Sequence, residues 1–158
     1  MDISIKIDQT RLNVRVAVMA KIDNEYIFEY DKNGYYFPIG GRIKINETSH
    51  DAAIREIYEE IQYKLNGHKL VGTIENFFEG DGEKFHEICF VYKADIKSNH
   101  KLPKGFHRLS IDEIKKHDIR PKIILDMIIY ENDMVNHYIV DNIIAQQGDA
   151  PAPASPAR

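Results

Sequence analysis

Residues 41–60 read Gly41-RIKIN-Glu47-TSHDAAI-Arg55-Glu56-Ile57-Tyr58-Glu59-Glu60, which places a glycine and one acid ahead of a helix-forming run rich in glutamate. On a helix that turns about 100° per residue, the glutamates at 56, 59 and 60 share one sector. Glutamates three or four positions apart repel one another and destabilise a bare helix by about 0.2–0.5 kcal/mol per pair. A divalent cation among the carboxylates offsets this repulsion, because hard cations such as Mg²⁺ bind oxygen ligands. The pattern therefore indicates either a metal-binding helix or a solvated acidic helix face.

The helix that carries these glutamates is predicted from Thr48 to about Gln62. Thr48 and Asp51 resemble a capping box at its start. Apolar residues recur at helical spacing beside the acidic sector, as expected for a helix packed against a sheet: Ala52, Ala53, Ile54, Ile57 and Ile61.

The chain before this helix is predicted to be β-structure. Its first run has the period of a strand with one buried face, because apolar residues alternate with others: Leu12, Val14, Val16 and Val18. A break at residues 23–24 precedes a second β-rich run over 25–30, so the two runs are expected to form a hairpin. Residues 38–41, Pro-Ile-Gly-Gly, are expected to interrupt regular strand pairing.

After the helix, two segments rich in β-formers, 69–78 and 84–94, flank a glycine-rich turn and predict a second hairpin. Residues 106–109 are predicted to form a short strand, and Ser110 opens a short helix. The apolar stretch from 122 to about 145 is predicted to form one or two helices. Strands, one central helix, further strands and terminal helices together predict a mixed α/β or α+β domain.

The composition is that of an ordinary globular protein. Its 158 residues fit one domain, with 43% apolar and 29% charged residues. No apolar run approaches the roughly 20 residues that span a bilayer, and the N-terminus lacks the apolar core of a signal peptide. The single cysteine, Cys89, agrees with a reducing compartment. The net charge of −4, from 21 Lys and Arg against 25 Asp and Glu, argues against binding to a long nucleic acid. A cytoplasmic protein that binds neither membranes nor long nucleic acids is expected.

The composition changes at the C-terminus. Residues 146–158 contain Pro, Ala and Ser but no bulky apolar residue. They are predicted to be a disordered tail or a remnant of cloning, outside a domain over residues 1–145.

The spacing within residues 41–60 resembles the Nudix box, G-x5-E-x7-R-E-U-x-E-E-x-G-U, in which U is a bulky apolar residue, and the chain is identified as a member of the Nudix family of MutT-like pyrophosphohydrolases. Every charged position of the box is present, and the resemblance covers about residues 10–131. It implies a Nudix-type mixed β-sheet sandwiched between α-helices, with a loop–helix–loop catalytic motif. One position departs from the pattern. Gln62 replaces the second glycine, where a left-handed helix end is expected and a Cβ costs about 1 kcal/mol.

The resemblance also implies the chemistry, which is hydrolysis of a nucleoside diphosphate linked to another moiety with Mg²⁺ or Mn²⁺ as cofactor. Gly41 is expected to offer its backbone carbonyl to the metal, and Arg55 with Glu47 is expected to brace the loop and the helix. The metal ligands of the family match three positions of this chain, Glu56, Glu59 and Glu60. One of these three is expected to accept the proton of the attacking water.

Four residues are candidates for substrate binding: Arg15, Tyr36, Phe37 and Glu87. Arg15 projects away from the valine face of its strand and meets either a phosphate or solvent. The aromatic residues at 35–37 either stack on a nucleobase or belong to the core. Glu87 lies in an otherwise apolar strand, in a region from which Nudix proteins often supply one further acid. It is a candidate ligand or base, with a structural ion pair as the alternative and two competitors, Glu75 and Glu79.

Three functions remain open from the sequence. The first is an Mg²⁺-dependent pyrophosphohydrolase of a small nucleotide derivative, such as ADP-ribose, a dinucleotide or a nucleoside triphosphate. The second is a Nudix-fold module that senses a nucleotide without cleaving it, for which Gln62 is the local argument. The third is an RNA-end pyrophosphohydrolase, which the acidic charge balance disfavours. The apolar run 123–129 belongs either to the core or to the surface of a homodimer, which is the expected oligomer.

Overall fold

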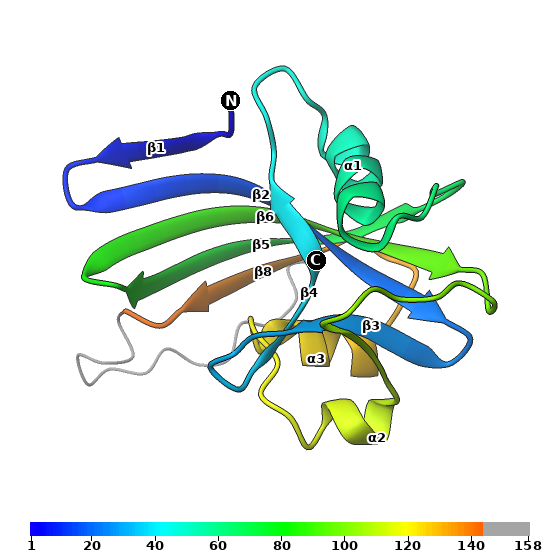
Figure 1. Ribbon diagram of the computed structural model, residues 1–158. Coiled ribbons are helices and arrows are strands. Elements are labelled where there is room, and N and C mark those ends of the chain that lie inside the picture. The colour runs from blue at the N-terminus through cyan, green and yellow to red at the C-terminus, as the bar shows by residue number, and fades with distance from the viewer. Residues whose placement is uncertain (144–158) are drawn as a thin grey trace.

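A mixed β-sheet of eight strands runs through the structure, a computed structural model that describes residues 1–143 (Figure 1). In chain order the elements are β1 (Ser4–Ile7), β2 (Thr10–Ile22), β3 (Glu25–Tyr30), β4 (Tyr36–Arg42), α1 (Ser49–Ile61), β5 (Lys69–Gly80), β6 (Glu83–Ile96), β7 (Phe106–Leu109), α2 (Ile111–Ile114), α3 (Ile123–Ile129) and β8 (Asn136–Asp141). The order across the sheet is β7-β3-β4-β2-β6-β5-β8, and β1 pairs with the N-terminal part of β2.

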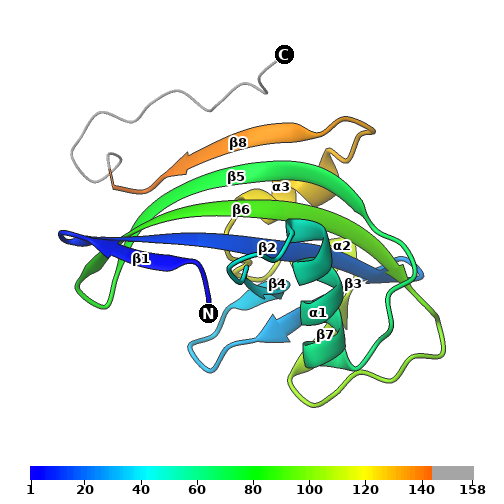
Figure 2. The same ribbon diagram turned by 90° about the horizontal axis from the view of Figure 1, so that it is seen from above.

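Strand β2 organises the sheet, because it is long enough to pair with four other strands. It is parallel to β6 along its whole length and antiparallel, in turn, to β1, β4 and β3. Figure 2 shows β2, β6, β5 and β8 lying side by side in one curved layer. The register places Asn13 beside Glu87 and Arg15 beside Cys89. Because side chains alternate along a strand, these four residues share one face of the sheet.

Helices cover both faces of this sheet, which confirms the predicted fold. Helix α1 lies on one face, and α2 and α3 lie on the other (Figure 1). The core under α1 joins alternate residues of β2 to the apolar side of the helix: Val16, Val18, Ala20, Ile22, Ala52, Ala53, Ile57 and Ile61. The core on the other face includes Met19, Phe28, Val91, Ile114, Ile124 and Met127.

Helix α1 confirms the predicted central helix at both ends. Thr48 is its N-cap, and the Thr48 hydroxyl accepts a hydrogen bond from the Asp51 N–H at 3.0 Å. Gln62 ends the helix in the left-handed region, at φ 56° and ψ 32°, and its N–H donates to the Tyr58 carbonyl. The left-handed end expected at this position is therefore present, although the residue is glutamine.

The two predicted hairpins are confirmed as β2–β3 and β5–β6. The prediction of helices up to about residue 145 was wrong in its second half. Helix α3 ends at Ile129, and residues 136–141 form β8, parallel to β5. Tyr138 and Val140 pack against the core whereas Ile139 is exposed, so the apolar pattern of this segment has the period of a strand.

Residues 38–41 were expected to interrupt strand pairing, and this prediction was also wrong. Strand β4 continues through them, with Pro38 opposite Phe28 of β3 and Gly41 opposite Val16 of β2. Glycine permits this close pairing, because a Cβ on Gly40 would lie 2.2 Å from the Val16 carbonyl oxygen.

The apolar run 123–129 contributes to the core, since α3 buries Ile124, Met127 and Ile128. The expected homodimer stays a prediction. Within residues 1–143, no helix is long and apolar enough to cross a membrane. The tail predicted at 146–158 lies outside the described residues.

Candidate functional site

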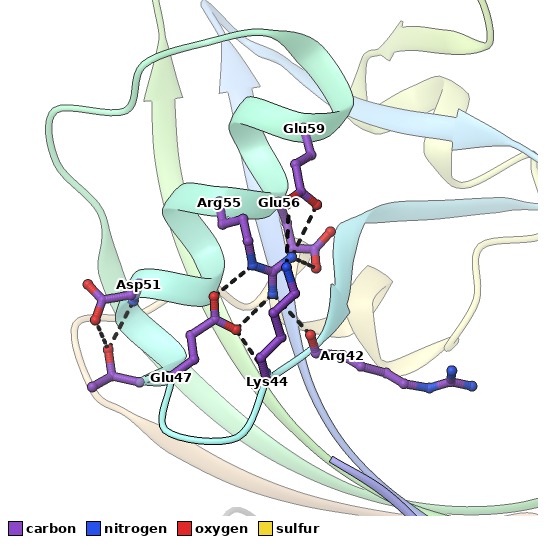
Figure 3. Close-up of polar contacts among 8 residues, drawn as sticks. Arg42, Lys44, Glu47, Asp51, Arg55, Glu56 and Glu59 are labelled. Carbon is purple, nitrogen blue, oxygen red and sulfur yellow. Dashed lines mark hydrogen bonds and ion pairs between the residues drawn. The ribbon is translucent and has the colours of Figure 1, made fainter. Parts of the chain in front are cut away.

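Arg55 ties the loop before α1 to the helix itself (Figure 3). Its Nε donates to Glu47 Oε1 at 2.6 Å and its Nη2 to Glu47 Oε2 at 2.8 Å, a two-pronged contact. Nη2 also donates to the Arg42 carbonyl at 3.1 Å, and the Lys44 N–H donates to Glu47 Oε2 at 2.8 Å. The hydrogen bond from Arg55 is the largest cause that lowers the pKa of Glu47 to about 2. Arg55 and Glu47 thus hold the loop against the helix.

Glu56 and Glu59 face the same guanidinium group. Arg55 Nη1 donates to Glu56 Oε1 at 2.5 Å and to Glu59 Oε2 at 3.2 Å. Glu56 is buried, whereas half of the Glu59 side chain is exposed, and Glu59 Oε1 lies 3.9 Å from Lys44 Nζ. Arg55 therefore supplies the positive charge between these two carboxylates (Figure 3).

Gly41 makes room for the Glu56 carboxylate. A Cβ at position 41 would lie 2.3 Å from Glu56 Oε1 and 2.8 Å from Oε2, far inside contact distance. The carboxylate consequently lies directly against the main chain of β4. Any larger residue at position 41 would displace the Glu56 carboxylate from this place.

Glu60 lacks the partners that the other two glutamates have. Its Oε2 is buried and finds no hydrogen-bond partner in the described part of the chain. The pKa of Glu60 is raised to about 8, first by burial and then by the carboxylates of Glu56 and Glu29, while the Gly40 N–H and Arg15 oppose the shift. A buried carboxyl group with an unpartnered oxygen destabilises the fold, and a bound cation would offset this cost.

The three glutamates supply the oxygen ligands that a hard divalent cation prefers. Across residues 1–143, no three His, Cys, Asp or Glu side chains are grouped closely enough to hold a metal ion. At α1, Arg55 engages Glu56 and Glu59 and leaves the buried Glu60 oxygen without a partner. The carboxylate donors and the unpartnered Glu60 oxygen fit a divalent cation. In this structure, however, Glu56 and Glu59 are positioned by their hydrogen bonds to the Arg55 guanidinium.

A cleft of about 1250 Å³ opens on the α3 side of the sheet. Strands β2, β6, β5 and β8 form its floor, and the β3–β4 turn and residues 117–122 form its walls. Of the four predicted substrate-binding residues, Arg15, Phe37 and Glu87 line the cleft. Tyr36 does not line it and packs instead with other rings: Tyr30, His107 and His117.

The cleft and the acidic helix meet at Gly40 and Arg15. Both residues line the cleft, and both act on the Glu60 carboxyl group. The Arg15 Nη1 also lies 3.4 Å from Glu87 Oε1. A ligand at this end of the cleft is therefore placed beside the Arg15 guanidinium and near the Glu60 carboxyl group.

Three residues of the cleft region were not predicted from the sequence. Asn13 is almost completely buried, and its Nδ2 donates to Glu87 Oε1 at 3.0 Å. Asn76 lines the floor, and Arg120 lies 4.2 Å above the ring of Tyr35 on the wall. The alternation of β2 was a signal for Asn13, which lies two residues before Arg15. Asn76 and Arg120 carry no local signal, because their positions depend on pairing with distant segments.

A family model described as NUDIX domain matches residues 15–126, which is more than half of the chain. No curated protein matches the chain. The motif that this domain is known by lies inside the matched range, at residues 41–60.

Solved structures share the fold. A mutator MutT protein from Bacillus halodurans has a TM-score of 0.63 and 16% identity, with 80% of this chain and 90% of that chain covered. A NUDIX hydrolase from Nitrosomonas europaea has a TM-score of 0.53 and 23% identity, with 73% and 85% covered. An Ap4A hydrolase from C. elegans has a TM-score of 0.56 and 13% identity, with 75% and 94% covered. Because these sequence identities are low, the structural similarity establishes the fold alone.

Proposed function

Because the chain belongs to the Nudix family and is a Nudix hydrolase, we propose that it uses Mg²⁺ or Mn²⁺ to hydrolyse the pyrophosphate bond of a small nucleoside diphosphate derivative. Nudix hydrolases act on pyrophosphate bonds in nucleotide derivatives and generally use divalent metal ions. One observation carries the proposal: the buried Glu60 oxygen without a partner lies next to a cleft that is large enough for a nucleotide.

The metal would be held by the main-chain carbonyl of Gly41 and by three carboxylates, those of Glu56, Glu59 and Glu60. A bound divalent ion neutralises charge on a pyrophosphate and lowers the pKa of the attacking water. Arg55 has two separate tasks in this arrangement. Its Nε and Nη2 keep Glu47 and the loop in place, whereas its Nη1 holds Glu56 and Glu59 and must release them when they bind a cation.

Cationic side chains of the cleft face the remaining charge of the substrate. Arg15 lies on the floor near Glu60, and Arg120 and Lys122 lie on the wall formed by residues 117–122. Phe37 offers an aromatic surface to a nucleobase. These contacts suit a small nucleotide and leave the substrate's other moiety open.

A nucleotide-sensing module is the second candidate. The pairing of Arg55 with both Glu56 and Glu59 favours it, because a guanidinium then takes the place of a cation between the carboxylates. Such a module binds its nucleotide in the same cleft but does not cleave it.

The test is a panel of ADP-ribose, a dinucleotide, a nucleotide sugar and nucleoside triphosphates, each incubated with the full chain and Mg²⁺ or Mn²⁺. We expect at least one substrate, and we expect Glu60→Gln to reduce its turnover by about 100-fold or more. Glu131→Gln is the matched control, because Glu131 pairs with Lys93 away from α1. Tight binding without cleavage of any compound supports the sensing module, and equal turnover by Glu60→Gln refutes the assigned role of the helix.

A further inference from the structure

Arg15 is a cation on the cleft floor, at the end that adjoins the acidic helix. Its side chain is 38% exposed, so a ligand in the cleft can reach it. On the other side of β2, the register places Arg42 of β4 directly opposite Arg15. Like charges directly opposite each other on neighbouring strands repel. A negative charge beside Arg15 offsets this repulsion and holds the guanidinium over the floor.

Glu87 supplies this negative charge. It lies on β6, diagonally across from Arg15, and its Oε1 is 3.4 Å from Arg15 Nη1. Among the residues that the structure describes, the other sheet positions that flank Arg15 on the cleft face carry no acid: Asn13, Ala17, Gly40, Arg42, Cys89 and Val91. Glu87 is therefore the acid that the strand register assigns to Arg15.

The Glu87 carboxylate is itself fixed in place. It is only 9% exposed, and Asn13 Nδ2 donates to its Oε1 at 3.0 Å. Asn13 is 1% exposed, so its amide is held inside the floor. Two donors from β2 thus converge on one oxygen of Glu87. The carboxylate that faces Arg15 is consequently anchored from its other side.

Arg15 keeps part of its guanidinium group for a ligand. Within residues 1–143, the hydrogen bond of its side chain to protein is made by Nη1 alone. The edge formed by Nε and Nη2 is the edge with which Arg55 holds both oxygens of Glu47. A guanidinium binds two oxygens of a carboxylate or a phosphate in this way, provided that its plane is correctly oriented. Arg15 can therefore contact Glu87 and a phosphate at the same time.

We propose that Glu87 is a positioning residue that orients the Arg15 guanidinium to bind the diphosphate of the substrate. The proposal rests on the proposed function, because it takes the ligand to carry a diphosphate. Glu87 acts through Arg15 and does not itself touch the substrate. This role differs from the extra metal ligand or base considered from the sequence.

The sign of one effect separates positioning from simple charge. Glu87 is an acid beside the phosphate site, so by charge alone its neutralisation would tighten the binding of an anion. Positioning has the opposite consequence. Without the Glu87 carboxylate, nothing on the floor opposes the repulsion between Arg15 and Arg42, and the guanidinium leaves the orientation that a phosphate requires. Neutralising Glu87 should therefore weaken the binding of a diphosphate.

The test measures binding of methylenediphosphonate to the full chain by isothermal titration calorimetry with Mg²⁺ present. This compound has a P–C–P linkage, which hydrolysis does not cleave, and it carries no base. We expect Arg15→Met to weaken binding by about 10-fold or more, because a charged hydrogen-bonded contact is lost. Glu87→Gln should weaken it by about threefold or more, and the glutamine keeps an oxygen for the Asn13 amide.

The double variant decides whether Glu87 acts through Arg15. In the Arg15→Met chain, Glu87→Gln should weaken binding no further, because the group that Glu87 positions is already gone. A direct contact of Glu87 with the metal or the ligand would instead cost the same factor with and without Arg15. Glu75→Gln is the matched control and should bind like wild type, since Glu75 lies on the opposite face of the same hairpin and pairs with His137.

Three results overturn the proposal: no binding of methylenediphosphonate by the wild-type chain, unchanged or tighter binding by Glu87→Gln, and an equal loss from Glu87→Gln in both backgrounds. If circular dichroism shows Glu87→Gln to be unfolded, Glu87→Asp replaces it, because aspartate keeps the charge but draws the carboxylate back from Arg15. Unchanged affinity of that variant also overturns the proposal. Failure of the proposed function reads out separately. A chain that cleaves nothing in the substrate panel but shows the loss that depends on Arg15 supports this proposal alone.

Discussion

Replacing Gln62 by glycine should stabilise the protein. Gln62 ends α1 with φ 56° and ψ 32°, a conformation that glycine adopts freely and that a residue with a Cβ adopts at a cost. The backbone hydrogen bond from the Gln62 N–H to the Tyr58 carbonyl does not depend on the side chain. The substitution therefore relieves the backbone and keeps the helix end.

The magnitude follows from two opposing effects. A left-handed residue with a Cβ costs about 1–2 kcal/mol, which glycine removes. Glycine also gains freedom in the unfolded chain, which costs about 0.4–1 kcal/mol. The side chain contributes little, because its one hydrogen bond, from Nε2 to the Glu59 carbonyl, is 3.3 Å long and exposed. We expect a net gain of roughly 0.5–1 kcal/mol, or about 1–4 °C in Tm for a chain of this size.

Urea unfolding at pH 7 and calorimetry measure this gain in the wild-type chain, in Gln62→Gly and in Gln62→Ala. The alanine variant removes the amide but keeps the Cβ, so it should show no gain. Equal stability of the glycine and wild-type chains would refute the assignment of strain to position 62. Hydrolysis should be unchanged in Gln62→Gly, because the substitution leaves the contacts of Glu56, Glu59 and Glu60 in place.

Two further substitutions test the acidic helix. Gly41→Ala places a Cβ 2.3 Å from Glu56 Oε1, so the carboxylate must move, and we expect metal-dependent hydrolysis to fall by about 100-fold. Gly67→Ala is its control, since a Cβ there meets nothing within 4 Å, and it should leave hydrolysis unchanged. Glu47→Gln removes a carboxylate whose pKa is about 2 in the folded chain, below the ordinary value of 4.5. The stability that this carboxylate contributes is therefore present above about pH 4.5 and is lost as the pH falls toward 2. Unfolding curves should show the variant less stable than wild type at pH 7, with the difference shrinking below pH 4.5; a constant difference would contradict the pairing with Arg55.

The sequence predicted the acidic helix well, because its signals are local. Thr48, the helical spacing of the isoleucines and the position of Gln62 define α1, and the spacing of Arg55 from Glu47 matches the contact that the structure shows. Strand β8 was missed because its alternating pattern is short and begins only a few residues after the apolar helix α3. Whether this segment forms a strand or a helix depends on its pairing with β5, and the local sequence carries no signal of that pairing.

The surroundings of Glu87 were predictable only in part for the same reason. Glu87 stood out as an acid within an apolar strand. Its partnership with Asn13 depends on the parallel register of β2 and β6, which joins positions 74 residues apart in the chain. The role of Arg55 toward Glu56 and Glu59 likewise required the side-chain geometry.

A crystal structure of the full chain grown with Mn²⁺, with the metal located by anomalous scattering, tests the central claim most directly. The account predicts a metal peak bound by oxygens of Glu56, Glu59 and Glu60 beside Gly41, with Arg55 Nη1 withdrawn from Glu56 and Glu59 and with the contact between Arg55 and Glu47 intact. The absence of any peak there, with Glu56 and Glu59 still paired to Arg55 and the Glu60 oxygen still without a partner, would contradict it.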